Sequence, residues 1–189
     1  MSDFKLPCEE IDEYLEKWES DDNGRYVRQD EILKKYFQVL YPKNNNLEEI
    51  LLKIYLLNDY YTAFYKNEKI KRNTFSVANY VLSIEDIDEM LDNGDIKCVD
   101  DITEKTNLYV FATKYCSFHR PDMYPIFDSK VEKVFKRYRG INGFDFNDVD
   151  LRKYRSYVTV YNDFKEKFEL NGYDYKQIDQ YLWLLGRKL

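Results

Sequence analysis

The stretch that decides the fold is residues 111–131, which read FATKYCSFHRPDMYPIFDSKV. Its first part is an apolar run that ends at Phe118 and predicts a helix. Pro121 and Pro125 bound a short turn, because proline lacks a backbone donor and restricts the residue before it. Asp128 follows, directly before a basic segment with apolar residues at helical spacing. The stretch therefore predicts a helix, a turn, and an aspartate that opens the next helix.

Helical periodicity extends along the whole chain. Apolar residues recur at helical spacing in residues 8–18, 27–40, 47–65, 74–81, 84–91, 107–118, 129–138, 148–168 and 176–188. No segment shows the period-two alternation of a strand, and the 4 prolines and 6 glycines are few for 189 residues. We expect an all-α fold with a single helical domain over residues 1–189. Within it we place an acidic N-terminal helix in 1–22 and C-terminal helices in 145–189.

Two helix starts carry side-chain signals. Ser83 with Asp86 three residues later is close to a capping box and predicts a helix from Ile84. Asp174 with Gln177 has the same spacing and predicts the start of the last helix.

Composition indicates a soluble globular protein, with 44% hydrophobic and 34% charged residues. No apolar run reaches the length of a membrane span, so we expect no membrane partner. Residues 1–5 lack the basic start and apolar stretch of a secretory signal, and we expect a cytoplasmic location. Three cysteines without a close pair predict neither a disulfide framework nor a zinc site. With His119 as the one histidine, the sequence predicts no metal and no cofactor.

The charge is unevenly distributed. The net charge of −6 argues against a nucleic-acid partner, because lysine and arginine supply most of the non-specific affinity for phosphates. However, residues 1–22 hold two basic and nine acidic residues, whereas residues 114–139 hold seven basic and three acidic ones. The basic segment is the one that contains the helix–turn–aspartate stretch. It could contact phosphates, form a solvated helix face, or be masked by the acidic segment until DNA or another partner displaces it.

Residues 47–138 resemble the helix-hairpin-helix DNA glycosylase superfamily. In that family an apolar helix also leads through a short loop to an aspartate at the start of the next helix, as residues 111–128 do here. The glycines of the family's hairpin are absent, since residues 102–108 read ITEKTNL at the corresponding place. The resemblance implies a DNA-binding protein that flips a base out of double-stranded DNA and cleaves the N-glycosidic bond.

The resemblance also implies roles for individual residues. Asp128 would supply the carboxylate that stabilises cationic charge at the sugar C1′ or orients water, and a helix N-terminus favours such a negative charge. Lys105 and Lys114 are the candidates for the amine that some members use as a nucleophile. Aromatic side chains around the turn would receive the base: Tyr115, Phe118, His119, Tyr124 and Phe127. Basic side chains would meet DNA phosphates: Arg120, Lys130, Lys133, Lys136 and Arg137.

Each of these roles has a structural alternative. Asp128 is an excellent N-cap whether or not it has a chemical role. Tyr115 and Phe118 have the spacing of core residues on one helix face. Lys114 could be a solvated side chain, and Arg120 could pair with Asp122 to fix the turn. The alternative for the whole chain is a non-catalytic helical module that retains the fold and binds a protein partner.

Overall fold

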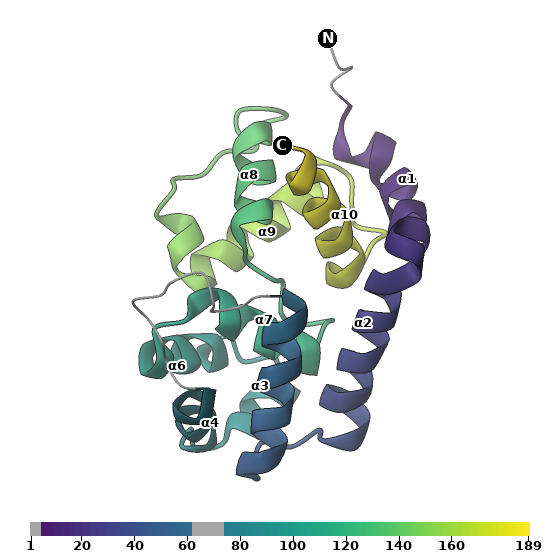
Figure 1. Cartoon of the computed structure of the whole chain (residues 1–189). Coiled ribbons are helices and arrows are strands. Elements are labelled where there is room, and N and C mark those ends of the chain that lie inside the picture. The colour runs from purple at the N-terminus through teal and green to yellow at the C-terminus, as the bar shows by residue number, and fades with distance from the viewer. Residues whose placement is uncertain (1–4, 62–73) are drawn as a thin grey trace. The chain divides into compact units, whose positions relative to one another are not determined.

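The structure is a computed structural model that describes residues 5–61 and 74–189. Within these ranges every regular element is a helix, as the sequence predicts (Figure 1). The last four residues of the helix predicted over 47–65 lie outside the described residues. No helix among the described residues is long and apolar enough to cross a membrane.

Thirteen helical elements are described in residues 5–61 and 74–189. In chain order they are α1 (Pro7–Ser20), the 3-10 turn η1 (Asp21–Gly24), α2 (Arg25–Lys34), the π-helical stretch η2 (Lys35–Leu40), α3 (Leu47–Tyr61), α4 (Thr74–Leu82), α5 (Ile87–Asn93), α6 (Lys97–Thr106), α7 (Tyr109–His119), α8 (Ser129–Tyr138), the 3-10 turn η3 (Asp150–Arg152), α9 (Tyr154–Lys167) and α10 (Tyr175–Lys188). They form two compact units. Unit 1 comprises Met1–Val27 and Phe127–Leu189, and unit 2 comprises Arg28–Ile126.

Unit 1 is built from both ends of the chain around an aromatic core. α10 packs against α8 and against α1. Phe135 of α8 lies 4.8 Å from Phe164 of α9 between ring centroids, and Phe164 lies 4.7 Å from Phe168. Tyr138 and Phe144 extend the same cluster. Much of the aromatic content of the chain is therefore core filling, since ring pairs at these distances add to the free energy of burial.

The contact between α8 and α10 is unusually close because of Gly186. A Cβ atom at this position would lie 2.6 Å from the backbone oxygen of Lys130 and 2.9 Å from its carbonyl carbon. The backbone of the first turn of α8 cannot move aside as a flexible side chain would. A residue without a side chain is therefore required where α10 crosses α8.

In unit 2, α7 is the central helix. It packs against α6, α3 and η2, and every residue of Phe111–His119 is buried. A helix that is enclosed on all sides has no polar face, which explains the apolar run in the sequence. α3 supplies Ile50, Ile54 and Leu57 to the same core and packs against α4.

The helix starts agree with the sequence at two places and differ at a third. Asp174 and Gln177 form the predicted capping box of α10, and Asp128 caps α8. The predicted start at Ser83 is wrong: α5 begins at Ile87, and the Ser83 hydroxyl donates to the carbonyl of Tyr80 instead. A serine that bonds to the preceding helix is no longer available as the cap of the next one.

We predict that Gly186→Ala destabilises the chain by about 1–3 kcal/mol, although alanine favours helix more than glycine does. The cause is the overlap between the new Cβ atom and the Lys130 backbone. Urea unfolding followed by circular dichroism measures it. Gly172→Ala is the matched control in the same unit, because a Cβ atom added there would have nothing within 4 Å. Equal stability of the two variants would contradict the close contact.

Candidate functional site

Asp128 is held rigidly at the start of α8. Its Oδ1 accepts hydrogen bonds from the backbone amides of Lys130 (2.8 Å) and Val131 (3.1 Å). The side chain is buried, and the apolar face of α8 anchors the helix through Val131, Val134, Phe135 and Tyr138. The carboxylate is therefore fixed in place by the same bonds that start the helix.

The basic side chains of α8 differ in their surroundings. Lys136 pairs with Glu132 (2.7 Å) and with Asp148 (3.2 Å). Lys133 and Arg137 are exposed, and Lys130 is half-buried. The charge of Lys136 is thus partly neutralised by its own unit, which makes it a weaker candidate for a phosphate contact than Lys133.

The acidic N-terminal segment is part of the core of unit 1. α1 packs against α10 and buries Ile11, Tyr14 and Trp18. Glu10 accepts a hydrogen bond from the Tyr181 hydroxyl (2.9 Å). Glu13 pairs with lysines of the same segment rather than with those of α8. Removal of residues 1–22 would expose the core, so truncation does not test masking of the basic segment.

α6 and α7 pack against each other as a helical hairpin. α6 ends at Thr106, and α7 begins at Tyr109 after the link Asn107–Leu108. Asn107 has the left-handed φ of 55° that glycine usually supplies, and asparagine is among the residues that tolerate it best. Its amide donates to the carbonyl of Thr103 (2.6 Å). The amide of Leu108 donates to the Thr106 hydroxyl (3.2 Å). Both amides of the link are therefore used inside the hairpin.

The two lysines proposed as nucleophiles lie in different environments. Lys105 is exposed near the end of α6. Lys114 is buried in α7, with its Nζ 5.0 Å from the ring centroid of Tyr61. The expectation that Lys114 could be solvated is therefore wrong. It failed because α7 is enclosed on all sides, so even its one lysine is packed.

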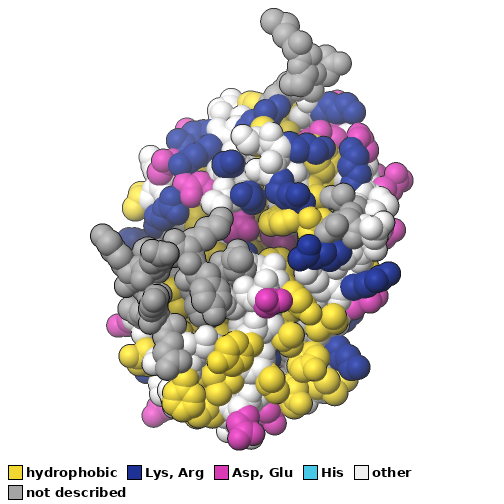
Figure 2. All heavy atoms as spheres, viewed as in Figure 1, with side chains coloured by type: hydrophobic (Ala, Val, Ile, Leu, Met, Phe, Trp, Pro, Cys, Tyr) yellow, Lys and Arg dark blue, Asp and Glu magenta, His cyan; other side chains and the backbone are white. Residues whose placement is uncertain are grey.

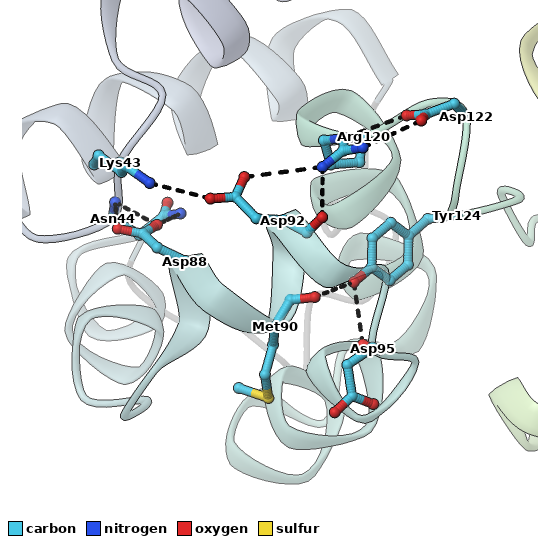
Figure 3. Close-up of polar contacts among 9 residues, drawn as sticks. All are labelled: Lys43, Asn44, Asp88, Met90, Asp92, Asp95, Arg120, Asp122 and Tyr124. Atoms are coloured by element: carbon cyan, nitrogen blue, oxygen red, sulfur yellow. Dashed lines mark hydrogen bonds and ion pairs between the residues drawn. The ribbon is translucent and has the colours of Figure 1, made fainter.

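The aromatic residues predicted to receive a base are buried and packed. In unit 2, the Tyr115 hydroxyl donates to Asn44 Oδ1 (2.5 Å). The Tyr124 hydroxyl donates to the carbonyls of Met90 (2.9 Å) and Asp95 (3.1 Å) (Figure 3). Phe118 packs on Phe37. In unit 1, Phe127 packs edge-on against Tyr157. The rings that the sequence offers for base binding thus have core contacts here.

Arg120 fixes the turn after α7, as the structural alternative predicts. Its Nε and NH2 donate to the two carboxylate oxygens of Asp122 (3.3 and 3.2 Å), and its NH1 donates to the carbonyl of Asp92 (2.7 Å) (Figure 3). The Asp92 carboxylate also pairs with Lys43 (3.2 Å). This network ties the turn to α5. Arg120 is therefore a turn residue with its donors already engaged, rather than a ready phosphate ligand.

A polar centre in unit 2 was missed by the sequence analysis. The ammonium of Lys53 is fully buried and donates to the carbonyls of Tyr41 (3.1 Å) and Lys43 (2.9 Å) and to Asn44 Oδ1 (2.7 Å). It also lies 3.3 Å from Nε2 of His119. The signal was present in the sequence, because Lys53 lies on the apolar face of α3 beside Ile50 and Ile54.

Burial lowers the pKa values of both titratable groups in this centre, Lys53 and His119. It lowers the pKa of Lys53 to about 8, although Asp88 and Glu49 oppose the shift. Burial also lowers the pKa of His119 well below its usual value, and the positive charge of Lys53 adds to the effect. His119 is therefore neutral at pH 7 and faces a lysine that titrates close to physiological pH.

A cavity of about 280 Å³ adjoins this centre. It lies within unit 2, and its lining combines His119 with the Arg120 network and the first part of the turn: Phe37, Gln38, Pro42, Asp88, Leu91, Asp92, His119, Arg120, Pro121 and Asp122. Among the described residues no group of three or more His, Cys, Asp or Glu side chains is placed to hold a metal ion. The polar lining of the cavity fits a small polar molecule.

Comparison with known proteins places the chain in a family. The family model HI_0787_N, described as an N-terminal domain, matches residues 10–123, so the chain belongs to this family. A Haemophilus influenzae protein with the name "Uncharacterized protein" is 37% identical over 159 residues, which covers 76% of this chain and 76% of that protein. No solved structure matches the chain. The matched residues include the Lys53 centre, and Asp128 follows the match by five residues.

We predict that the contribution of Lys53 to the stability of the chain rises with pH between about 8 and about 10. The lysine titrates near 8 in the folded chain and near 10.4 when unfolded, so the unfolded chain binds more protons in this window. We expect a gain of about 2 kcal/mol from about pH 7.5 to about pH 9.5. Urea unfolding at each pH measures it. The gain is read as the change with pH in the stability difference between the native chain and Lys53→Met, because Cys116 and Tyr115, whose pKa values burial raises, act equally in both chains. A difference that stays constant with pH would contradict the lowered pKa of Lys53.

Proposed function

We propose that the chain is a DNA-binding protein of the base-excision glycosylase type. In this proposal it flips a nucleotide out of the duplex, and the Asp128 carboxylate assists cleavage of the N-glycosidic bond. The observation that carries the proposal is the rigid placement of Asp128 at the start of an amphipathic helix whose exposed side chains include Lys133 and Arg137.

The chemistry requires a negative charge that does not move. As the N-glycosidic bond breaks, positive charge develops at C1′ of the sugar, and a fixed carboxylate can stabilise that charge or orient the attacking water. Two hydrogen bonds from backbone amides to the same carboxylate oxygen hold the Asp128 side chain in one position. A helix N-terminus adds a favourable dipole for an anion.

The hairpin of α6 and α7 supports the same proposal. It joins two helices through two residues, and its second helix, α7, leads through the turn to Asp128. Asn107 supplies the left-handed backbone that a tight hairpin needs in place of glycine. Since the amides of Asn107 and Leu108 are used within the hairpin, most phosphate contacts in this proposal come from lysine and arginine side chains.

We predict that Asp128→Asn abolishes base release while DNA binding and stability remain. Asparagine is as good an N-cap as aspartate, so the change removes the charge and keeps the cap. The measurement is release of the base from duplexes that carry damaged bases, together with binding to duplexes that carry an abasic-site analogue. We expect a loss of at least about 100-fold in the rate of release.

Asp174→Asn is the matched control, because Asp174 caps α10 through the amide of Gln177 (2.8 Å) in the same unit. It should leave base release unchanged. Release by the Asp128→Asn chain at the native rate would remove Asp128 from the chemistry. If the native chain bound no duplex at low salt, the DNA proposal itself would fail.

A second candidate function is a helical protein-interaction module, and exposed apolar side chains of unit 2 favour it. Several large hydrophobic residues of this unit are more than a third exposed: Ile32, Val39, Leu40, Leu52, Tyr55, Phe75, Tyr80 and Leu82. Figure 2 shows hydrophobic side chains gathered over α3 and α4. Contiguous apolar surface on a soluble protein often marks a binding site for another protein.

A second copy of the chain is the simplest partner with which to test this candidate. If the apolar surface of α3 mediates association, sedimentation velocity should show a concentration-dependent dimer. Leu52→Lys should shift it to the monomer, because a buried unpaired charge opposes association. Lys97→Gln, an exposed change on α6, is the control. A monomer at all concentrations would exclude self-association through this surface.

A further inference from the structure

The cavity of unit 2 has one side-chain donor in its lining that the protein leaves without a partner. His119 lines the cavity and is 6% exposed. Its Nε2 lies 3.3 Å from Lys53 Nζ, and an ammonium group has no lone pair, so Nε2 is the acceptor in this contact. The single proton of the neutral ring is then on Nδ1. Within residues 5–61 and 74–189 this Nδ1–H group has no hydrogen-bond partner.

A matching acceptor lies close to this donor. Gln38 of η2 also lines the cavity, and its Nε2 donates to the carbonyl of Phe118 (2.9 Å). This carbonyl belongs to the peptide bond that precedes His119, so the amide of Gln38 is held near the imidazole. The bond from Nε2 also fixes the orientation of the amide, and in the part of the chain that the structure describes Oε1 has no donor. The lining thus offers one donor and one acceptor.

The charged groups of the lining, in contrast, are already compensated. Each of the three carboxylates has a partner within the unit (Figure 3): Asp88 with Asn44, Asp92 with Lys43, and Asp122 with Arg120. A bound ion would lose its hydration without gaining a free counter-charge, so the cavity favours a neutral molecule. The remaining lining is apolar: Phe37, Pro42, Leu91 and Pro121.

The structural alternative is that His119 serves Lys53 alone and that water satisfies Nδ1. Acceptance of a hydrogen bond from Lys53 explains the position of Nε2. It does not explain the space beside the ring. A single water needs about 10–15 Å³ of such a volume, whereas the cavity measures about 280 Å³. The cavity therefore has room for a molecule of several heavy atoms next to the donor and the acceptor.

We propose that this cavity binds a small neutral molecule with an amide edge, in which a carbonyl oxygen and an N–H group lie side by side. The ligand carbonyl accepts from His119 Nδ1–H, and the ligand N–H donates to Gln38 Oε1. Primary carboxamides and lactam rings both present such an edge. The proposal is independent of the proposed DNA function, because it uses residues of unit 2 and does not involve Asp128.

The first test uses His119 itself, which is the only histidine of the chain, so NMR of its labelled ring nitrogens shows one residue. At about pH 6.5, where Lys53 is charged, the free chain should show the tautomer with the proton on Nδ1. Titration with uracil, a lactam, or nicotinamide, a carboxamide, should shift the Nδ1 resonance saturably, with a Kd of about 1 mM or tighter. Their N-methylated analogues keep the carbonyl but have no N–H group. They should bind at least about 5-fold more weakly.

The second test removes the acceptor. Gln38→Leu should weaken binding of the same probe by at least about 5-fold. Gln29→Leu is the matched control, because Gln29 is also a half-buried glutamine of unit 2 but does not line the cavity. A response to one probe class alone would support the site and identify its source of amide. No saturable shift with either class would overturn the proposal and leave water as the partner of Nδ1. Equal affinity for the N-methylated analogues would also overturn it.

Discussion

The burial of α7 is the constraint on which unit 2 depends. From Phe111 to His119 the helix is buried, so its polar side chains there need partners inside the unit. Tyr115 reaches Asn44, Thr113 bonds to the carbonyl of Val110, and His119 meets Lys53. Through these contacts, residues 41–44 and helix α3 both pack against α7. The polar centre is thus a consequence of placing a tyrosine and a histidine on a helix with no free face.

The sequence was sufficient where a signal was local. The all-α class follows from helical spacing, and the starts of α8 and α10 follow from Asp128 and Asp174, because an N-cap depends on only three or four neighbouring residues. It failed at Ser83, where the hydroxyl had a second possible partner in the preceding helix. It also missed α6, although Cys98, Val99 and Ile102 are at helical spacing. The short apolar stripe was hidden among charged residues.

The candidate site was harder to predict because burial depends on contacts far apart in the chain. The sequence could place Tyr124 and Phe127 in a turn, but it could not show that their rings are packed in a core. Likewise, Lys53 and His119 are separated by 66 residues, so no spacing rule connects them. Asp128 is different: its geometry is set by its own helix, and it is fixed as predicted, while its chemical role stays a prediction.

The discontinuous make-up of unit 1 has a consequence for how the chain folds as it is synthesised. Residues 28–126 leave the ribosome as one continuous segment and can complete unit 2 without any later helix. α1 emerges before this segment, yet its partner α10 follows only after it. Until then Ile11, Tyr14 and Trp18 lack the surface that covers them. The acidic residues between them give α1 a negative charge, which opposes its association with other chains before α10 covers it.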